Sequence, residues 1–293
     1  MRGATESAER GGGSGMNSEE GRAAVSVIMP AYNEEKSIEA CFYEVFEALE
    51  GYGKPFEIIL EEDGSTDRTP SMIDRLAKKH GNTKVLHFAK RMGKGFGIRK
   101  CLEVARGECI VFIDSDGEYP AEKIPEFIDV INSYDVVVGA RSKWVDQKGG
   151  NRVLRALLSR TYGLLVRRLL GVDLQDYQSG LKAFRRQVID AIEPLESSGF
   201  EIDSEMLLKA ERKGFKITSI AITYSFRGDS KVNIVLDSVK MLLALLDWKL
   251  ESDTRTPLLN SPAMTSPKPD VRSFRPSQTF DRMQTDHRNE VKK

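Results

Sequence analysis

The sequence VFIDSDGEYP, residues 111–120, runs from an apolar segment directly into three acids at every second position, Asp114, Asp116 and Glu118. Residues i and i+2 at the end of a strand project to the same side, so Asp114 and Asp116 can converge on one ion. Hard oxygen ligands of this kind suit Mg²⁺ or Mn²⁺. Taken alone, the stretch fits a polar turn that ends a strand equally well.

The apolar start of this stretch belongs to a series of five short segments rich in Val, Ile and Phe. They lie at residues 25–29, 56–60, 84–88, 109–113 and 135–139, and each has the composition of a strand buried on both faces. Helix-like segments lie between them at 34–49, 68–80, 95–105 and 124–132. This alternation predicts an α/β fold with a parallel central sheet and helices on both faces. Ligands of such sheets bind beyond the carboxyl ends of the strands, where the acids of 114–118 fall.

Composition limits the possible architectures and partners. The chain has 293 residues, 40% of them hydrophobic, which is enough to bury one large domain or two small ones. Lys plus Arg and Asp plus Glu number 44 each, so the net charge gives no indication of a nucleic-acid partner. Three scattered cysteines, Cys41, Cys101 and Cys109, predict buried free thiols, not a disulfide framework or a zinc site.

The two ends of the chain differ in composition from its middle. Residues 1–23 are rich in Gly, Ser and Glu and predict a flexible leader without the apolar segment of a signal peptide. Residues 253–293 carry prolines among Ser, Thr and charged residues and predict a disordered tail. The predicted folded domain is therefore 24–252. It contains no apolar run of the roughly 18 residues needed to cross a bilayer.

Three polar motifs follow predicted strands. The segments PAYNEE (30–35) and EEDGSTD (61–67) lack the G-x-G-x-x-G spacing, which argues against a dinucleotide-binding oxidoreductase. The segment GKGFG (93–97) lacks the spacing of a phosphate-binding P-loop. Arg91 and Lys94 beside a helix N-terminus can attract phosphate, but a Gly-rich turn with solvated bases is at least as good an interpretation.

Several of these segments together resemble glycosyltransferase family 2. They are VIMPAYNEEKSI, EEDGSTDRT, GKGFGIRKCLEVARGECIVFIDSDGEYP and VVVGAR. In the second half, LQDYQSGLKAFRR, GFEIDSEML and FRGDSK are similar to the polyprenol-phosphate hexose synthases, which include dolichol-phosphate mannose synthases and dolichyl-phosphate glucosyltransferases. The resemblance implies a GT-A fold, which is Rossmann-like with a mostly parallel central sheet. It also implies an inverting hexose transfer, with mannose favoured, from GDP-mannose or UDP-glucose to a polyprenyl (dolichyl) phosphate.

The resemblance also implies a role for each polar motif. Binding of Mg²⁺ or Mn²⁺ is assigned to the D-x-D acids and the acid that follows them, Asp114, Asp116 and Glu118. Nucleotide-sugar binding is assigned to Pro30, Tyr32, Glu34, Asp63, Asp114, Arg141, Arg227 and Lys231. The acceptor phosphate is assigned to Arg227, Ser230 and Lys231, and the catalytic set to Asp116, Arg141, Asp176 and Lys231.

The sequence departs from the family pattern at three places. Glu118 stands where the family often has Gln, which adds negative charge to the metal site. Glu62 replaces the first acid of the usual D-D-G-S motif, and its longer side chain is expected to affect base contact and donor choice. The spacer between Arg227 and the pair Ser230–Lys231 is shorter than usual, which affects the expected placement of Arg227 more than that of Lys231.

The chemistry of the acceptor bears on the role of Asp176. A hydroxyl acceptor needs a general base, whereas a phosphate monoester has a second pKa near 6 and is already a nucleophile at pH 7. Asp176 is therefore expected to orient or coordinate a group, not to remove a proton. The alternative is a structural acid that caps a turn or pairs with Arg185 or Arg186.

A lipid acceptor requires contact with a membrane surface. Residues 151–172 form an amphipathic pattern with Leu on one side and Arg mostly on the other, and 239–250 are also apolar. Such helices can lie in a membrane interface, although a helix facing the core explains 151–172 about as well. The expected location is cytoplasmic, peripherally attached to the cytoplasmic face of a membrane. The remaining alternatives are a GT-A transferase with a soluble or protein acceptor and an inactive binding module.

Overall fold

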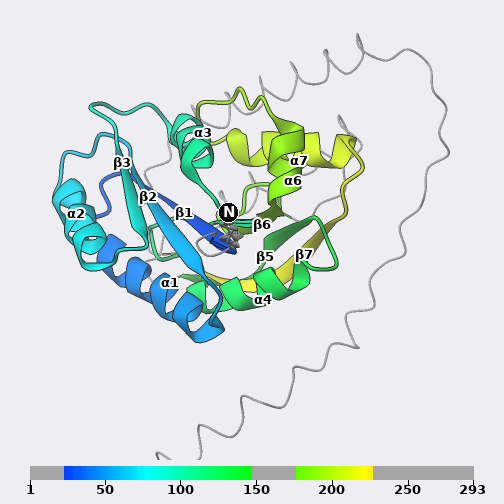
Figure 1. Cartoon of the computed structure of the whole chain (residues 1–293), viewed down its shortest axis with the longest axis horizontal. Coiled ribbons are helices and arrows are strands. Elements are labelled where there is room, and N and C mark those ends of the chain that lie inside the picture. Colours follow the sequence, from blue (N-terminus) through cyan, green and yellow to red (C-terminus); the bar gives the residue numbers. More distant parts are fainter. Residues whose placement is uncertain (1–22, 147–175, 227–293) are drawn as a thin grey trace, which may run out of the picture. The chain divides into compact units, whose positions relative to one another are not determined.

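The computed structural model describes residues 23–146 and 176–226 (Figure 1). In these residues one sheet has the strand order β3-β2-β1-β4-β6-β5-β7. The strands are β1 (Val25–Ala31), β2 (Phe56–Glu62), β3 (Thr83–His87), β4 (Cys109–Phe112), β5 (Val136–Asp146), β6 (Lys182–Arg185) and β7 (Ile217–Phe226). All neighbouring pairs are parallel except those of β6, so the expected mostly parallel α/β sheet is confirmed.

Helices pack against both faces of the sheet, as the alternation of segments predicts (Figure 1). One face packs against α1 (Ile38–Tyr52), α2 (Thr69–Lys79), the short 3-10 helix η1 (Ala121–Lys123) and α4 (Ile124–Val130). The other packs against α3 (Lys94–Val104), α6 (Arg186–Ile192) and α7 (Ile202–Arg212). Strand β1 shows why: Val25, Val27 and Met29 point into the first core and Ile28 points into the second, as the two-residue period of a strand requires.

Strand β6 differs from the expected strict alternation. Its four residues, KAFR, pair antiparallel with β4 and with β5, and β7 then pairs parallel to β5 on the far side. The short strand has no run of Val or Ile, because only Ala183 and Phe184 supply its apolar contacts to the two cores. A local sequence pattern therefore does not distinguish it from a loop.

The first helix begins later than its sequence pattern predicts. Helix α1 starts at Ile38 and not at 34, because the Glu34 N–H donates to Thr69 Oγ1 at the start of α2 and residues 34–37 form a turn whose Glu34 carbonyl accepts from the Ser37 N–H at 3.0 Å. The helix ends at Gly53, whose φ of 77° is the left-handed conformation that glycine adopts readily at a helix C-terminus.

Two further observations bear on the sequence predictions. Cys41, Cys101 and Cys109 are buried free thiols, as expected. Across the described ranges 23–146 and 176–226, no helix has both the length and the apolar character to span a bilayer.

Candidate active site

The site lies where the carboxyl ends of β1, β2 and β4 meet. Backbone hydrogen bonds join the ends of these strands. The Asp63 N–H donates to the Ala31 carbonyl at 3.1 Å, and the Ile113 N–H donates to the Ile28 carbonyl at 3.1 Å. The loops that follow these three strands carry most of the predicted site residues in the described part of the chain. This edge is the expected ligand-binding edge of an open α/β sheet.

The loops after β1 and β2 are joined by side chains. The Asn33 N–H donates to Ser65 Oγ at 2.9 Å, and the Thr66 N–H donates to Asn33 Oδ1 at 2.8 Å. A further bond runs from the Glu34 N–H to Thr69 Oγ1 at 2.8 Å. These bonds satisfy backbone groups in a segment without regular structure and explain the left-handed conformation of Asn33. They fix the positions of Tyr32 and Glu34, two of the predicted nucleotide-binding residues.

The predicted base-binding residues occupy this joined pair of loops. Pro30 is half-buried in β1, opposite Glu61 of β2. The Arg91 guanidinium lies over the Tyr32 ring, 4.2 Å from its centroid, and its charge favours the face of that ring. The Glu34 carboxylate accepts a hydrogen bond from Ser37 Oγ at 2.7 Å. These side chains form an aromatic and polar border at the carboxyl end of β1.

The Asp63 carboxylate is buried and holds the chain that leads into α3. It accepts hydrogen bonds from the backbone N–H groups of Met92 and Gly93, the latter at 2.9 Å to Oδ2. Gly93 has a φ of 98°, so the turn needs a glycine here as well as the carboxylate. The base contact expected of Asp63 stays a prediction, and what the structure gives is a role in fixing the loop at 92–93.

The departure at Glu62 has a structural explanation. Its Oε1 accepts a hydrogen bond from the Ser65 N–H, and its Oε2 lies 3.3 Å from His87 Nδ1. His87 Nε2 lies 3.0 Å from Asp74 Oδ1, so one imidazole joins two carboxylates. Burial lowers the pKa of His87, but the bonds to Asp74 and Glu62 outweigh burial and raise it above the usual value. The Glu62 side chain thus contacts both the turn at Ser65 and the imidazole of His87.

The three acids of 114–118 lie in the loop after β4. The Glu118 N–H donates to Asp116 Oδ1 at 2.9 Å across Gly117, whose φ is 73°. Burial raises the pKa of Asp116 well above the usual value, and repulsion from Asp114 and Glu118 raises it further. Negative charge crowded in this way fits a divalent cation, which relieves the repulsion. Within residues 23–146 and 176–226, however, no three His, Cys, Asp or Glu side chains converge in metal-binding geometry.

Asp114 is bonded to a lysine that sequence reasoning interpreted differently. Lys94 Nζ lies 2.8 Å from Asp114 Oδ1 and 3.0 Å from Asp203 Oδ2 of α7. Lys94 is therefore not a solvated base, and its side chain is only 10% exposed. The N-terminus of α3 is also occupied, because the N–H groups of Gly95 and Phe96 donate to the Ser198 carbonyl at 3.0 and 3.3 Å. The phosphate-binding interpretation of this helix end is not supported by these contacts.

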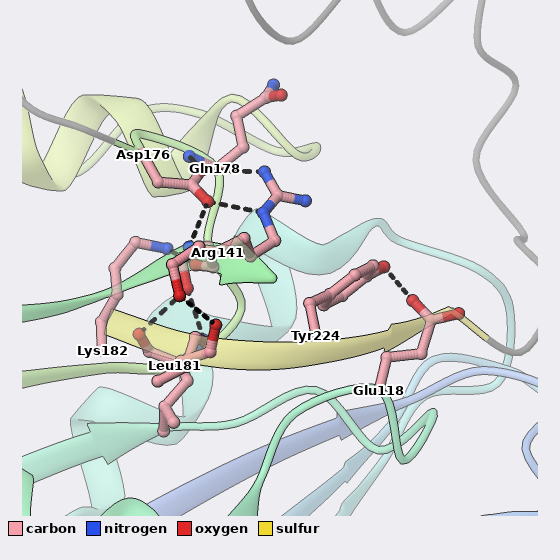
Figure 2. Close-up of polar contacts among 10 residues, drawn as sticks. Glu118, Arg141, Asp176, Gln178, Leu181, Lys182 and Tyr224 are labelled. Carbon is pink, nitrogen blue, oxygen red and sulfur yellow. Dashed lines mark hydrogen bonds and ion pairs between the residues drawn. The ribbon is translucent and has the colours of Figure 1, made fainter. Parts of the chain in front are cut away.

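Glu118 is bonded to β7 on the other side of the acidic loop. The Tyr224 hydroxyl donates to Glu118 Oε2 (Figure 2). The Ser225 N–H donates to the Glu118 carbonyl at 3.0 Å. The ring of Tyr224 packs edge-on against Tyr119 with centroids 5.2 Å apart. The Arg141 guanidinium lies 5.3 Å from the centroid of the Tyr224 ring. Tyr224 thus contacts both the acidic loop and the arginine at the end of the VVVGAR segment.

Arg141 and Asp176 are brought together as a bidentate ion pair (Figure 2). Arg141 Nε donates to Asp176 Oδ2 at 2.5 Å, and Nη2 donates to Oδ1 at 2.8 Å. The Gln178 N–H also donates to Asp176 Oδ1, at 3.2 Å. Of the structural alternative, the capping part agrees with the bond from Gln178, whereas pairing with Arg185 or Arg186 is not found. Those two arginines donate to backbone carbonyls, of Ile131 and Asn132 for Arg185 and of Gly107 and Ala105 for Arg186.

Two site residues were missed from the sequence, Lys182 and Asp203. Lys182 Nζ lies 2.7 Å from Asp203 Oδ1, and both side chains are buried. Their only signal was their presence in the motifs QSGLKAF and GFEIDSEML, which gave no indication of a partner. The remaining predicted residues, Arg227, Ser230 and Lys231, and the segments 151–172 and 239–250 lie outside the described residues.

Comparison with known proteins identifies relatives of this sequence. The family model "Glycosyl transferase family 2" matches residues 26–193. The chain is 35% identical over 234 residues to glycosyltransferase AglD of Haloferax volcanii, a match that covers 77% of this chain and 37% of that protein. It is 31% identical over 240 residues to the dolichol-phosphate mannosyltransferase of Pyrococcus furiosus, covering 78% and 65%. A dolichyl-phosphate beta-glucosyltransferase, ALG5C of Trichomonas vaginalis, is 29% identical over 257 residues, covering 79% and 75%. The chain thus spans less than two thirds of the length of the first two relatives.

Solved structures match over most of the described fold. The mannosyltransferase PcManGT from Pyrobaculum calidifontis, in complex with GDP-Man and Mn²⁺, gives a TM-score of 0.53 at 19% identity, covering 82% of this chain and 66% of the other. Glucosyl-3-phosphoglycerate synthase from Mycobacterium tuberculosis, in complex with Mn²⁺ and UDP-glucose, gives 0.56 at 22% identity, covering 78% and 79%. At these identities the likeness concerns the fold.

Proposed function

The chain belongs to glycosyl transferase family 2 and has the GT-A fold, and we propose that it transfers a hexose from a nucleotide sugar to the phosphate of a membrane polyprenyl lipid. The observation that carries the proposal is that the acidic loop and Arg141 both contact one tyrosine of β7. Glu118 of the loop accepts a hydrogen bond from the Tyr224 hydroxyl, and the Arg141 guanidinium, paired with Asp176, lies 5.3 Å from the centroid of the same ring. A donor diphosphate bound through a cation at the acids would therefore bring substrate phosphates close to this guanidinium.

The acids and the loops would bind the donor. Asp114, Asp116 and Glu118 are the groups that would hold Mg²⁺ or Mn²⁺, and a bound cation there would neutralise charge on the leaving nucleoside diphosphate. Tyr32, Glu34, Pro30 and Asp63 border the place proposed for the nucleotide. The joined loops after β1 and β2 would hold these residues in place before the donor binds, which lowers the cost of ordering them.

The transfer itself needs no general base. An oxygen of the lipid phosphate attacks the anomeric carbon, the bond from that carbon to the nucleotide's terminal phosphate oxygen breaks, and the bonding pair leaves with the diphosphate. Configuration at the anomeric carbon is inverted by one such displacement. The lipid phosphate is largely a dianion at pH 7, since its second pKa is near 6. Asp176 is fixed on Arg141, which supports an orienting role and not proton removal.

The sugar and the lipid are the finer parts of the proposal. Mannose is the first sugar to test, because the relative from Pyrococcus furiosus is a dolichol-phosphate mannosyltransferase, and glucose is the alternative because of the glucosyltransferase relative. We place the transferase domain at 24–252, between a leader at 1–23 and a tail at 253–293. Attachment to the cytoplasmic face of a membrane would come from the segments 151–172 and 239–250.

Transfer assays test the proposal directly. The full chain is incubated with radiolabelled GDP-mannose or UDP-glucose, Mn²⁺ and dolichyl phosphate in vesicles, and label is counted in the organic phase. We expect label from one donor to enter the lipid and to be lost when EDTA is added or when Asp116 is changed to Asn. Label that enters only a water-soluble or protein acceptor would assign the chain to another acceptor class. Hydrolysis of the donor without any acceptor product would also contradict the proposal.

A further inference from the structure

We propose that Asp203 of α7 is a positioning residue that orients Asp114, the first acid of the D-x-D motif, by acting through Lys94. The inference rests on the proposed function in one respect, namely that Asp114 binds the metal–nucleotide complex. No part of it depends on which sugar or acceptor the chain uses.

Lys94 connects the two acids from the first turn of α3. Its Nζ lies 2.8 Å from Asp114 Oδ1 and 3.0 Å from Asp203 Oδ2. The Asp203 side chain is 5% exposed and the Lys94 side chain 10% exposed, whereas Asp114 reaches the surface at 26%. The pairing thus runs from a buried helix to the acid at the edge of the site. Asp203 does not contact the edge itself and can act there only through the lysine.

Asp203 also pairs with a lysine of the antiparallel strand β6. Its second oxygen, Oδ1, lies 2.7 Å from Lys182 Nζ, and Lys182 is fully buried. Lys182 Nζ also donates to the Ser179 carbonyl. Asp114, Lys94, Asp203 and Lys182 thus alternate acid and base along one chain of contacts, and buried ionisable groups are retained in folded proteins when they are paired in this way. Each oxygen of Asp203 therefore has its own lysine, which fixes the direction in which Lys94 points.

The second carboxylate oxygen of Asp114, Oδ2, lies against the backbone of Gly180. A Cβ added at Gly180 would overlap Asp114 Oδ2, so the carboxylate lies directly over the glycine. Gly180 is two residues before Lys182, so the segment that anchors Asp203 also forms the wall behind Asp114. With Lys94 on one oxygen and Gly180 behind the other, the carboxylate has little freedom to turn. Rigid support of this kind sets ligand geometry before the ligand binds.

The electrostatic balance agrees with this geometry. Burial lowers the pKa of Lys94, but attraction to Asp114 and Asp203 outweighs burial and holds it above the usual value. Burial raises the pKa of Asp203, but Lys182 and Lys94 outweigh burial and hold it below the usual value.

The decisive experiment removes the anchor without leaving a buried charge unpaired. In the double variant Asp203→Leu with Lys182→Met, two apolar side chains of similar size replace a buried ion pair, which is often neutral or stabilising. We expect the Tm to stay at or above that of the parent chain. We expect the Kd for GDP or UDP in the presence of Mn²⁺, measured by calorimetry, to rise by about tenfold or more, as for other groups that orient metal ligands.

Three further variants make the result specific. Asp203→Asn keeps the size of the side chain. If the double variant does not fold, the Kd of this variant for GDP or UDP with Mn²⁺ tests the positioning role instead. Asp203→Glu keeps the charge and should recover part of the affinity. Glu57→Gln is the matched control, because Glu57 is also a buried acid with a lysine partner, Lys84 at 2.6 Å, but lies at the opposite end of β2. That control should lower the Tm and leave the Kd unchanged.

The outcomes separate this inference from the proposed function. If the folded Asp203 variants bind Mn²⁺–nucleotide as tightly as the parent chain, the positioning role is wrong while hexose transfer is unaffected. If Glu57→Gln weakens binding as much as the Asp203 variants do, the effect is general destabilisation and the inference is also wrong. If the parent chain binds nucleotide and the Asp203 variants do not, but no lipid product forms, the inference holds and the proposed acceptor fails. A parent chain that binds neither nucleotide overturns both.

Discussion

The carboxylate of Asp176 occupies one whole edge of the Arg141 guanidinium, through contacts of 2.5 Å to Nε and 2.8 Å to Nη2. The two side chains are 9% and 12% exposed, so the pair is largely removed from water. Both residues were expected to act in the reaction, and their pairing limits what each can do. A substrate phosphate can contact only those N–H groups of Arg141 that Asp176 does not occupy, and both carboxylate oxygens of Asp176 accept hydrogen bonds from Arg141.

Replacement of Asp176 by Asn should therefore affect stability and turnover but not the pH profile. Breaking one side of a buried ion pair leaves the other charge unpaired, and we expect the free energy of unfolding to fall by about 3 kcal/mol. Transfer should slow because Arg141 is no longer oriented. The acid limb of the pH–rate profile should keep its position, since the lipid phosphate, and not Asp176, sets it.

Chemical denaturation and rate measurements from pH 5 to 9 check this prediction. The control is Glu103→Gln, which breaks the exposed pair of Glu103 with Lys100 (2.7 Å) and should change neither quantity, because surface pairs contribute little. A pH profile that loses its acid limb only in the Asp176 variant would make Asp176 a general base.

Asp116 is the acid whose removal should abolish transfer without harming the fold. Burial and the neighbouring acids raise its pKa, so its charge opposes folding, and Asp116→Asn should leave the Tm unchanged or higher. Loss of a group that holds a catalytic cation costs several kcal/mol of transition-state stabilisation, which predicts at least about a hundredfold slower transfer. The measurements are a thermal melt and a titration of rate with Mn²⁺. Full activity of the parent chain in excess EDTA would contradict a metal at this site.

Tyr224 is expected to orient Glu118 for the same cation. Its hydroxyl donates to Glu118 Oε2 from the neighbouring strand β7. Tyr224→Phe keeps the ring packing against Tyr119 but removes that donor, and we expect the Mn²⁺ concentration for half-maximal rate to rise about tenfold. Tyr52→Phe is the control, because the Tyr52 hydroxyl donates to Asp129 at 2.8 Å, outside the acidic loop. An equal rise in both variants would exclude a specific role for Tyr224.

The sequence predicted the parts of this molecule that depend on local pattern. Strands β1, β2 and β4 were predicted from apolar runs that a sheet buried on both faces requires, and the acids 114–118 were placed at the correct strand end. Strand β6 was missed because four residues with a single Phe carry no strand pattern. The start of α1 was misplaced because bonds from a second loop, at 65–69, hold Asn33 and Glu34 outside the helix.

The partners of the charged residues depend on tertiary structure and were not predictable from local sequence. The alternative role for Asp176 included pairing with Arg185 or Arg186, which are near in the chain, but its partner Arg141 is 35 residues away. Lys94 and Asp203 are 109 residues apart, and only the packing of α7 against α3 brings them together. Motif membership marked candidate site residues but did not indicate which of them contact one another.

Glu61 supplies the last prediction, because both of its carboxylate oxygens are buried without a hydrogen-bond partner in the described part of the chain. The side chain lies against the bare backbone of α3, where a Cβ at Gly97 would overlap its carboxyl group. Burial raises the pKa of Glu61 to about 9, and Asp63 and Glu62 add to the shift. Glu61 is therefore protonated in the folded chain at neutral pH and ionised in the unfolded chain.

The sign of its effect on stability follows from that difference. Above the unfolded pKa of about 4.5, Glu61 releases its proton in the unfolded state but retains it in the folded state, which lowers the free energy of the unfolded state relative to the folded one. Glu61 therefore destabilises the fold increasingly as the pH rises towards 9. Glu61→Met, with an unbranched apolar side chain of similar length, removes this penalty. Its advantage in free energy of unfolding over the parent chain should grow by about 1.4 kcal/mol per pH unit between pH 5 and pH 8.

Urea denaturation of both chains at several pH values measures this slope, and Glu57 on the same strand provides a control of opposite sign. Burial raises the pKa of Glu57, but Lys84, Ser26 and the Arg106 N–H outweigh burial and lower it. Its stabilisation is therefore present above the unfolded pKa and lost as pH falls through the lower folded pKa. Glu57→Gln should be destabilising at pH 7 and progressively less so in acid. If the difference between Glu61→Met and the parent chain is the same at pH 5 and pH 8, Glu61 is ionised in the fold and has a partner for its charge.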